Sequence, residues 1–307
     1  MPGTAPPPVS AEQERTLQET GGFCSKFCLA IPLGTWWGVN VRLSGLYIVV
    51  WGLLGWFADY YTSWEWAFLW AVLSVLVVGG SILVHEFGHA IATNVLGGRA
   101  TEIMLWPLGG VTLLDHNGGP RIDLLISVAG PLTHIPQAVF WLVQALIASG
   151  IGNCSGQSWI ARNCAADFWD LFWYRVSAMG VAINIVMLVG NLIPMYPLDG
   201  GRALLDAFLS CGMTPRMAAI FSVALSMPMA VATAVLVVVY LKDWVTFSLA
   251  LLLLIPNLFM VYLIVKRQLH VHPSFRNLKI SRDEMDVPIL SNDTNPSTDA
   301  EMSPVRL

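Results

Sequence analysis

One apolar segment constrains this chain more than any other feature, because it is long enough to cross a membrane and ends in ionisable residues. Residues 66–84 contain no charged side chain, and a bilayer span needs roughly 20 apolar residues. The segment runs directly into His85, Glu86 and His89. Ionisable groups are costly in lipid, so their presence in a span indicates a functional site.

These three residues form an H-E-x-x-H motif. Residues four apart lie on one face of a helix, so His85 and His89 can present two imidazoles to one metal ion. Glu86 points about 100° around the helix from His85 and can reach a water on that metal. Zinc lowers the pKa of such a water toward neutrality. The motif predicts one Zn²⁺ per chain, held by His85 and His89, with Glu86 as general base; the alternative is a chance match on an ordinary helix.

The composition indicates a polytopic membrane protein. Only 12% of the 307 residues are charged and 55% are hydrophobic, whereas soluble domains carry about 25% charged residues. We expect an all-α fold embedded in a lipid bilayer, with no nucleic-acid partner. Six transmembrane helices are predicted, at about residues 44–57, 64–92, 122–149, 171–193, 217–241 and 244–265.

Two apolar segments do not fit this helical pattern. Residues 103–114 are too short to span and contain Pro107 and Gly109-Gly110. They predict a short membrane-associated β-hairpin, which lipid tolerates only where it is buried against protein or lines a wet cavity. Residues 31–43 combine Gly with paired Trp, and we expect them at the membrane interface.

The chain divides into a membrane domain and two polar tails. Residues 1–30 and 267–307 are expected to be disordered, and residues 31–266 to form the membrane domain, with a catalytic core at about 64–216. The positive-inside rule places both termini in the cytoplasm and leaves the organelle open. It rests on basic residues at one set of span ends, namely Arg99, Arg121, Arg202, Arg216, Lys266 and Arg267. Cys154 and Cys164 share one loop, either as a disulfide or as free thiols.

A catalytic zinc site needs a third protein ligand, and Asp199 is the candidate. Pro194 and Pro197 break the helix at the end of the fourth span. That span runs in the same direction as the second, so Asp199 reaches the same side of the membrane as His85. The alternative is that Asp199 only caps a short helix at 202–210.

Four motifs together resemble the site-2 protease family of intramembrane zinc metalloproteases. They are HEFGH at 85–89, PLGG at 107–110, SVAGP at 127–131 and NLIPMYPLDGG at 191–201. The resemblance implies that His85, His89 and Asp199 bind zinc and that Glu86 is the base. It also implies that Asn191 positions the substrate or the developing oxyanion, and that the hairpin pairs with an extended substrate strand.

Three polar positions near these motifs have no assigned catalytic role. His134 follows the AGP motif where family members often have Asn, and it either bonds a neighbouring helix or lines a water route. Asn184 is expected to bond between helices. Asp115-His116 lies in a Gly-rich turn and is expected to be solvated.

The motifs favour an endopeptidase that hydrolyses a peptide bond in or near a transmembrane helix of a membrane protein. Two other classes remain open: a six-span transporter or channel, and a catalytically inactive scaffold. A transporter would spread polar residues over several depths of the membrane, whereas here they gather at one depth. The sequence does not name the substrate.

Overall fold

The computed structural model forms two compact units. The first contains residues 1–115 and 126–192, and the second contains residues 116–125 and 193–307. The structure describes residues 30–58, 64–107, 109–151, 154–155, 163–164, 168–236, 239, 244–278 and 280–288. The remaining residues of both predicted tails lie outside these ranges.

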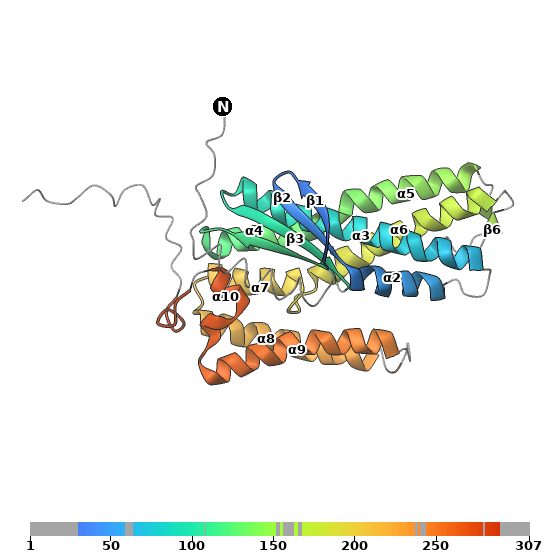
Figure 1. Ribbon diagram of the computed structural model, residues 1–307. Coiled ribbons are helices and arrows are strands. Elements are labelled where there is room, and N and C mark those ends of the chain that lie inside the picture. Colours follow the sequence, from blue (N-terminus) through green and yellow to red (C-terminus); the bar gives the residue numbers. More distant parts are fainter. Residues whose placement is uncertain are drawn as a thin grey trace, which may run out of the picture. The chain divides into compact units, whose positions relative to one another are not determined.

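The first unit is built on long apolar helices (Figure 1). α2 (Gly45–Ala58) packs against α3 (Trp64–Val95), and α5 (His134–Ile151) packs against α6 (Phe168–Leu192). α4 (Gly119–Leu132) has its residues up to Leu125 in the second unit and the rest in the first. It precedes α5, and a break at Thr133 separates the two helices. The third predicted span is therefore two helices, of which α4 carries Pro131 near its end.

Among the described residues, four helices are long and apolar enough to cross a membrane. They are Ala67–Val95, Phe172–Leu192, Pro215–Leu236 and the stretch Gly119–Gly150, which counts α4 and α5 together. The apolar helices Gly45–Phe57 and Leu253–Lys266 are shorter. A multi-pass membrane protein is thus indicated, and the count of six spans stays a prediction.

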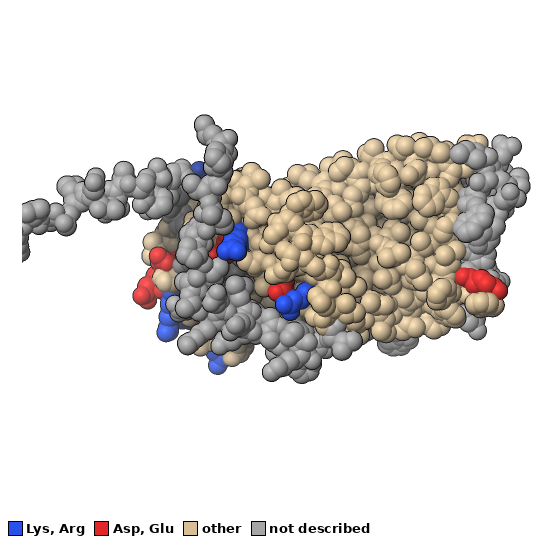
Figure 2. All heavy atoms as spheres, turned by 45° about the horizontal axis from the view of Figure 1, so that its top comes forward, with Lys and Arg blue, Asp and Glu red and all other residues tan. Residues whose placement is uncertain are grey.

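The surface agrees with this assignment. Large apolar side chains are exposed on α3, α5 and α6, among them Phe68, Phe140, Leu146 and Val186. On the face that Figure 2 shows, most of the described surface carries neither basic nor acidic side chains. Such a surface is suited to lipid, because lipid solvates apolar groups and rejects charged ones.

A four-stranded sheet completes the first unit, so the expectation of an all-α fold with one hairpin is only partly right. β1 (Ala30–Trp36), β2 (Val39–Ser44), β3 (Arg99–Trp106) and β4 (Gly109–Asp115) lie in the order β1-β2-β3-β4. β3 and β4 are the predicted hairpin and pair antiparallel. β2 pairs parallel with β3, although more than 50 residues separate them in the chain.

The segment expected at the membrane interface is the β1–β2 hairpin. Trp37 and Gly38 both have positive φ, at 49° and 82°, as a two-residue type I′ turn requires. Val39 and Val41 are each only 1% exposed, and their alternation is the pattern of a half-buried strand. The paired Trp and Gly concealed this pattern, because both are also typical of an interface.

The buried face of the sheet packs on α3. Its core joins Val41, Ile103 and Leu105 of the strands to Ile82 and Phe87 of the helix. β3 and β4 both contact α3. This packing fixes the hairpin beside the helix that carries the H-E-x-x-H motif.

The second unit contains the third predicted ligand, Asp199, at the start of α7 (Asp199–Ser210). It also contains α8 (Pro215–Leu236), α9 (Trp244–Lys266), η2 (Leu269–Val271) and α10 (Pro273–Asn277). α8 packs on α9. Disorder was expected after residue 266, but η2 and α10 are folded, and Leu269, Phe275, Ile280 and Met285 are buried in the core of this unit. The apolar side chains of this segment were the sequence signal that it folds. The polar residues around them concealed that signal.

Two short strands lie in the 150–170 loop. β5 (Cys154–Ser155) pairs antiparallel with β6 (Asn163–Cys164), and Cys154 lies opposite Cys164 in the register. The side chains of these residues are outside the described part of the structure. The disulfide therefore stays a prediction.

Candidate metal centre

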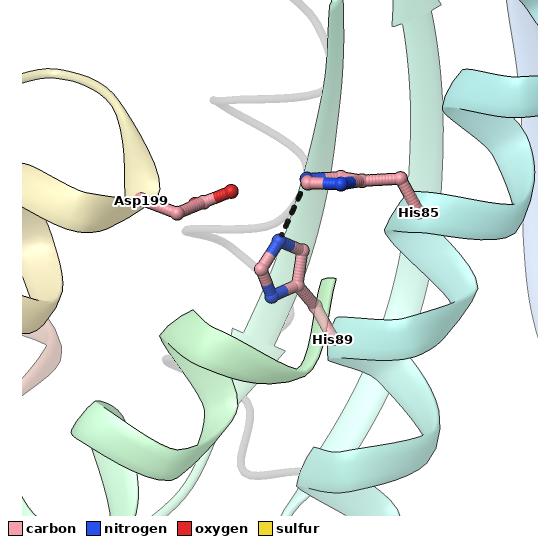
Figure 3. A group of neighbouring side chains, drawn as sticks. All are labelled: His85, His89 and Asp199. Carbon is pink, nitrogen blue, oxygen red and sulfur yellow. Dashed lines mark hydrogen bonds between the residues drawn. The ribbon is translucent and has the colours of Figure 1, made fainter. Parts of the chain in front are cut away.

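α3 places the two histidines of the motif on one face. His85 and His89 are 4% and 3% exposed, and their Nε2 atoms lie 3.1 Å apart. Figure 3 shows both rings reaching from α3 toward each other. The helical period of 3.6 residues produces this alignment, as the sequence predicted.

His89 is fixed from behind by α4. Its Nδ1 lies 2.7 Å from the carbonyl oxygen of Ile126, and a carbonyl can only accept, so Nδ1 donates. Gly130 lies against the imidazole, and a Cβ there would collide with the ring. The glycine of the SVAGP motif therefore allows α4 to approach His89 closely enough to orient it.

His85 is fixed by a different partner. Its Nδ1 lies 3.0 Å from Nε2 of His134, whose Nδ1 lies 2.8 Å from Oδ1 of Asn184. His134 and Asn184 are both fully buried. The predicted hydrogen bond of His134 to a neighbouring helix is confirmed, and it extends to a candidate metal ligand as well.

The predicted base, Glu86, faces the β3–β4 hairpin. It is 6% exposed, and the Thr112 hydroxyl donates a hydrogen bond to Glu86 Oε2 at 2.5 Å. Gly110 lies against the same side chain, and a Cβ there would collide with the Glu86 Cγ and carboxyl group. The PLGG motif thus brings β4 into direct contact with the carboxylate.

Asp199 is the first residue of α7, and it is half-buried. The N-cap position is Leu198, so Asp199 does not fill the capping position considered as the alternative. The Arg202 guanidinium lies 3.6 Å from Asp199 Oδ1 and 3.5 Å from Asp123 Oδ1. His116 also pairs with Asp123, at 3.4 Å, and is buried; the expectation that it is solvated is wrong.

The three predicted ligands form a group that could hold a metal ion. One ligand atom each of His85, His89 and Asp199 lies within 4.8 Å of the others (Figure 3). Two imidazoles and one carboxylate are a ligand set that catalytic zinc sites use. The residues present therefore fit zinc.

Asn191 is not among these residues. It lies in the last turn of α6 and is half-buried. Its role in positioning the substrate stays a prediction. Sequence reasoning did not single out Thr112 or Arg202 as parts of the site. Their only signal was proximity to motifs, since Thr112 follows PLGG by two residues and Arg202 directly follows LDGG.

A comparison with protein families decides the identity. The sequence profile of Peptidase family M50 matches residues 73–235, which is more than half of the chain. The chain belongs to peptidase family M50. The match contains the H-E-x-x-H motif and Asp199, and it confirms the resemblance to site-2 proteases.

Individual curated relatives are 27–29% identical to the chain over the aligned residues alone. Rip3 from Mycobacterium tuberculosis is 28% identical over an alignment of 204 positions, and the match covers 59% of this chain and 44% of Rip3. Zinc metalloprotease MJ0392 from Methanocaldococcus jannaschii is 29% identical over 147 residues, 46% of this chain and 35% of the relative. Stage IV sporulation protein FB of Bacillus subtilis is 27% identical over 143 residues, 45% of this chain and 40% of the relative.

The chain thus spans less than half the length of each of these curated relatives. Among solved structures, the site-2 protease from Methanocaldococcus jannaschii is similar with a TM-score of 0.49 and 21% identity. The similarity covers 79% of this chain and 96% of that one.

Proposed function

We propose that this chain is an intramembrane zinc metalloendopeptidase that hydrolyses a peptide bond in or near a transmembrane helix of a membrane protein. One observation carries the proposal. Glu86 is buried on α3 directly after His85, its carboxylate is held by Thr112, and the Nε2 atoms of His85 and His89 converge beside it. A buried carboxylate next to two converging imidazoles is the arrangement of a metal-assisted hydrolase.

The residues have separate roles in this proposal. His85, His89 and Asp199 hold one zinc ion, which when bound supplies a Lewis acid and an activated water. Glu86 takes the proton of the attacking water and passes it to the leaving amine. Thr112 holds one carboxylate oxygen, which leaves Oε1 for that proton transfer. Asn191 offers amide donors to the substrate or the oxyanion.

The proposed protein is multi-pass with both termini in the cytoplasm, and its substrates are transmembrane proteins. Four long apolar helices support the membrane assignment, and the basic residues at one set of span ends support the orientation. Labelling of single introduced cysteines with a reagent that cannot cross membranes tests the orientation. The 150–170 loop should react from outside, and the residues after 266 only from the cytoplasm.

The buried polar residues favour hydrolysis over the transporter and scaffold alternatives. In the first unit, His85, Glu86, His89, His134 and Asn184 are all buried. Hydrogen bonds link His85, His134 and Asn184 in succession, and the Nε2 atoms of His85 and His89 face each other, so these polar groups gather in one cluster. A scaffold would need none of this arrangement.

The decisive experiment compares the full-length chain with its Glu86→Gln variant in cells that lack the endogenous protein. Glu86→Gln should retain zinc, because Glu86 is not a ligand, and membrane-bound fragments of substrates should accumulate uncut. Glu65→Gln is the matched control, since Glu65 lies in the first turn of the same helix, and it should cleave like the wild type. Full activity of Glu86→Gln would refute the proposed mechanism, and a wild-type chain that neither binds zinc nor cleaves substrate would favour the transporter.

A further inference from the structure

A chain of buried polar groups leads away from His85 into the first unit. It runs from His85 through His134 to Asn184, and from there to Gly180 and Ser81. His134, Asn184 and Ser81 are at most 3% exposed. Burying this many polar groups is costly unless each has a partner. Apolar side chains would pack these helices without that cost, so this series of hydrogen bonds requires an explanation beyond helix packing.

The far end of the chain sets the direction of every hydrogen bond in it. Asn184 Nδ2 lies 2.9 Å from the carbonyl oxygen of Gly180 and 3.2 Å from the Ser81 hydroxyl. A carbonyl oxygen can only accept, so the Asn184 amide must turn its NH₂ group to Gly180. Its Oδ1 then faces His134 and can only accept.

This orientation determines the tautomers of two histidines in turn. His134 Nδ1 must carry a proton in order to donate to Asn184 Oδ1, so in the neutral ring His134 Nε2 is an acceptor. His85 Nδ1, which lies 3.0 Å from that atom, must therefore be the donor. The lone pair of the neutral His85 ring is left on Nε2, the atom that faces His89 Nε2.

His89 reaches the same state by a shorter route, since its Nδ1 donates to the Ile126 carbonyl. Both Nε2 atoms then present lone pairs to one point, which is the state that binds a metal ion. The carbonyls of Ile126 on α4 and Gly180 on α6 thus determine the tautomers of His89 and His85, respectively.

We propose that His134 and Asn184 are positioning residues that hold His85 in its metal-binding tautomer before any ion arrives. The inference rests on the proposed function, because it assigns His85 as a ligand. Neither residue contacts the ion or the substrate. Hydrogen-bond partners of metal-ligating histidines typically raise metal affinity by about 10–100-fold, and we expect an effect of that size.

Zinc affinity of the purified full-length chain, measured by chelator competition without substrate, tests this inference. His134→Phe keeps a planar ring but removes the acceptor, and zinc affinity should fall by about 10–100-fold. His134→Gln places an amide oxygen near the same point and should restore most of the affinity. Asn184→Leu should weaken zinc binding less, because His134 is then free to adopt either tautomer.

The double variant tests whether Asn184 acts through His134 or whether the two residues affect zinc binding independently. In His134→Phe/Asn184→Leu the affinity should equal that of His134→Phe alone, because Asn184 acts only through His134. Ser177→Ala is the matched control, since Ser177 is also buried on α6 and its hydroxyl donates to the Trp173 carbonyl of the same helix. It should bind zinc like the wild type. Wild-type affinity in His134→Phe would overturn the inference.

A second measurement does not depend on how the variants fold. Nitrogen NMR of ¹⁵N-histidine in the zinc-free wild type should show protonated Nδ1 and unprotonated Nε2 for both His85 and His134. A protonated Nε2 on either neutral ring would overturn the inference. Both readouts are independent of peptide hydrolysis, so a chain that binds zinc but cleaves nothing would refute the proposed function and leave this inference standing.

Discussion

The hydroxyl of Thr112 on β4 donates a hydrogen bond to Glu86 on α3, at 2.5 Å. The residues are 26 positions apart, and the hairpin meets the helix at the side chain proposed as the base. A hairpin that only filled space in the membrane would not need this bond. The contact links the segment proposed to receive substrate to the group proposed to act on it.

We expect Thr112→Val to slow cleavage while zinc stays bound. Valine keeps the shape of threonine but cannot donate, and hydrogen bonds to charged groups contribute about 1.5–3 kcal/mol. Loss of this bond should therefore lower kcat by about tenfold or more. Thr101→Val on β3 is the control, because Thr101 bonds only weakly to the Leu113 carbonyl, at 3.4 Å. Equal rates for the two variants would show that Thr112 does not serve Glu86.

Gly130→Ala should impair zinc binding although alanine favours helices. A Cβ at Gly130 would collide with the His89 ring, so the imidazole must turn away from the Ile126 carbonyl. We expect at least a tenfold loss of zinc affinity, about the size of losing an orienting partner. Gly150→Ala, in α5 with open space around it, is the control and should bind zinc normally. A circular dichroism spectrum checks that both variants keep their helices.

Arg202→Lys should weaken zinc binding although the positive charge remains. The two guanidinium nitrogens of Arg202 reach Asp199 and Asp123, and a lysine ammonium is a point charge that cannot hold both in this geometry. Without a guanidinium that contacts both carboxylates, Asp199 loses its orientation, and zinc affinity should fall by about tenfold. Arg216→Lys is the control, since its partner Asp286 is largely exposed. An unchanged affinity in Arg202→Lys would mean that Asp199 is positioned by other groups.

Folding stability should fall in acid because of His272. Burial lowers the pKa of His272 from 6.5 to about 4, so the unfolded chain binds a proton that the folded chain excludes. The stabilisation is complete above pH 6.5 and is lost as the pH falls toward 4, and it amounts to at most about 3 kcal/mol. His272→Phe keeps an aromatic ring beside Tyr196 and Phe275. Thermal unfolding at pH 5 and pH 8 should then differ less than in the wild type; an equal difference would exclude His272 as the cause.

The sequence predicted the local parts of this molecule well and the long-range parts poorly. The i,i+4 spacing of His85 and His89 placed them together because helical periodicity is a local property. The hairpin was visible from Pro107 and the glycines that follow it. The parallel pairing of β2 with β3 was not visible, because it joins segments that no local pattern connects.

The same limit applies to the site. Its ligand types could be read from motifs, but the groups that orient them could not. His134 was recognised as unusual, yet its contact with His85 depends on how α3 packs with the first turn of α5. Gly110 and Gly130 belonged to motifs from the start, and only the structure showed that each makes room for one side chain of the H-E-x-x-H motif.

The free edge of the sheet gives the last prediction. Among the described strands, β4 lies at the edge of the order β1-β2-β3-β4, and the outer side of an edge strand can pair with an extended strand. A substrate helix must unwind to expose a peptide bond, and in lipid its freed backbone groups need new partners. We therefore expect the edge of β4 to bind the unwound segment.

Proline substitution at neighbouring residues of β4 can separate this role from stability. Successive residues on a strand turn their N–H groups to opposite sides, so of Leu113 and Leu114 one faces β3 and the other faces the free edge. Proline at the residue whose N–H faces β3 should destabilise the sheet, because it removes a hydrogen bond between the two strands. Proline at the residue whose N–H faces the outer edge should preserve the melting temperature and zinc content but slow cleavage. Substrates with Gly or Asn near the cut should be cleaved faster than all-Leu helices by the wild type. If the stable proline variant cleaves as fast as the wild type, the edge of β4 does not hold the substrate, and unwinding must be supported elsewhere in the site.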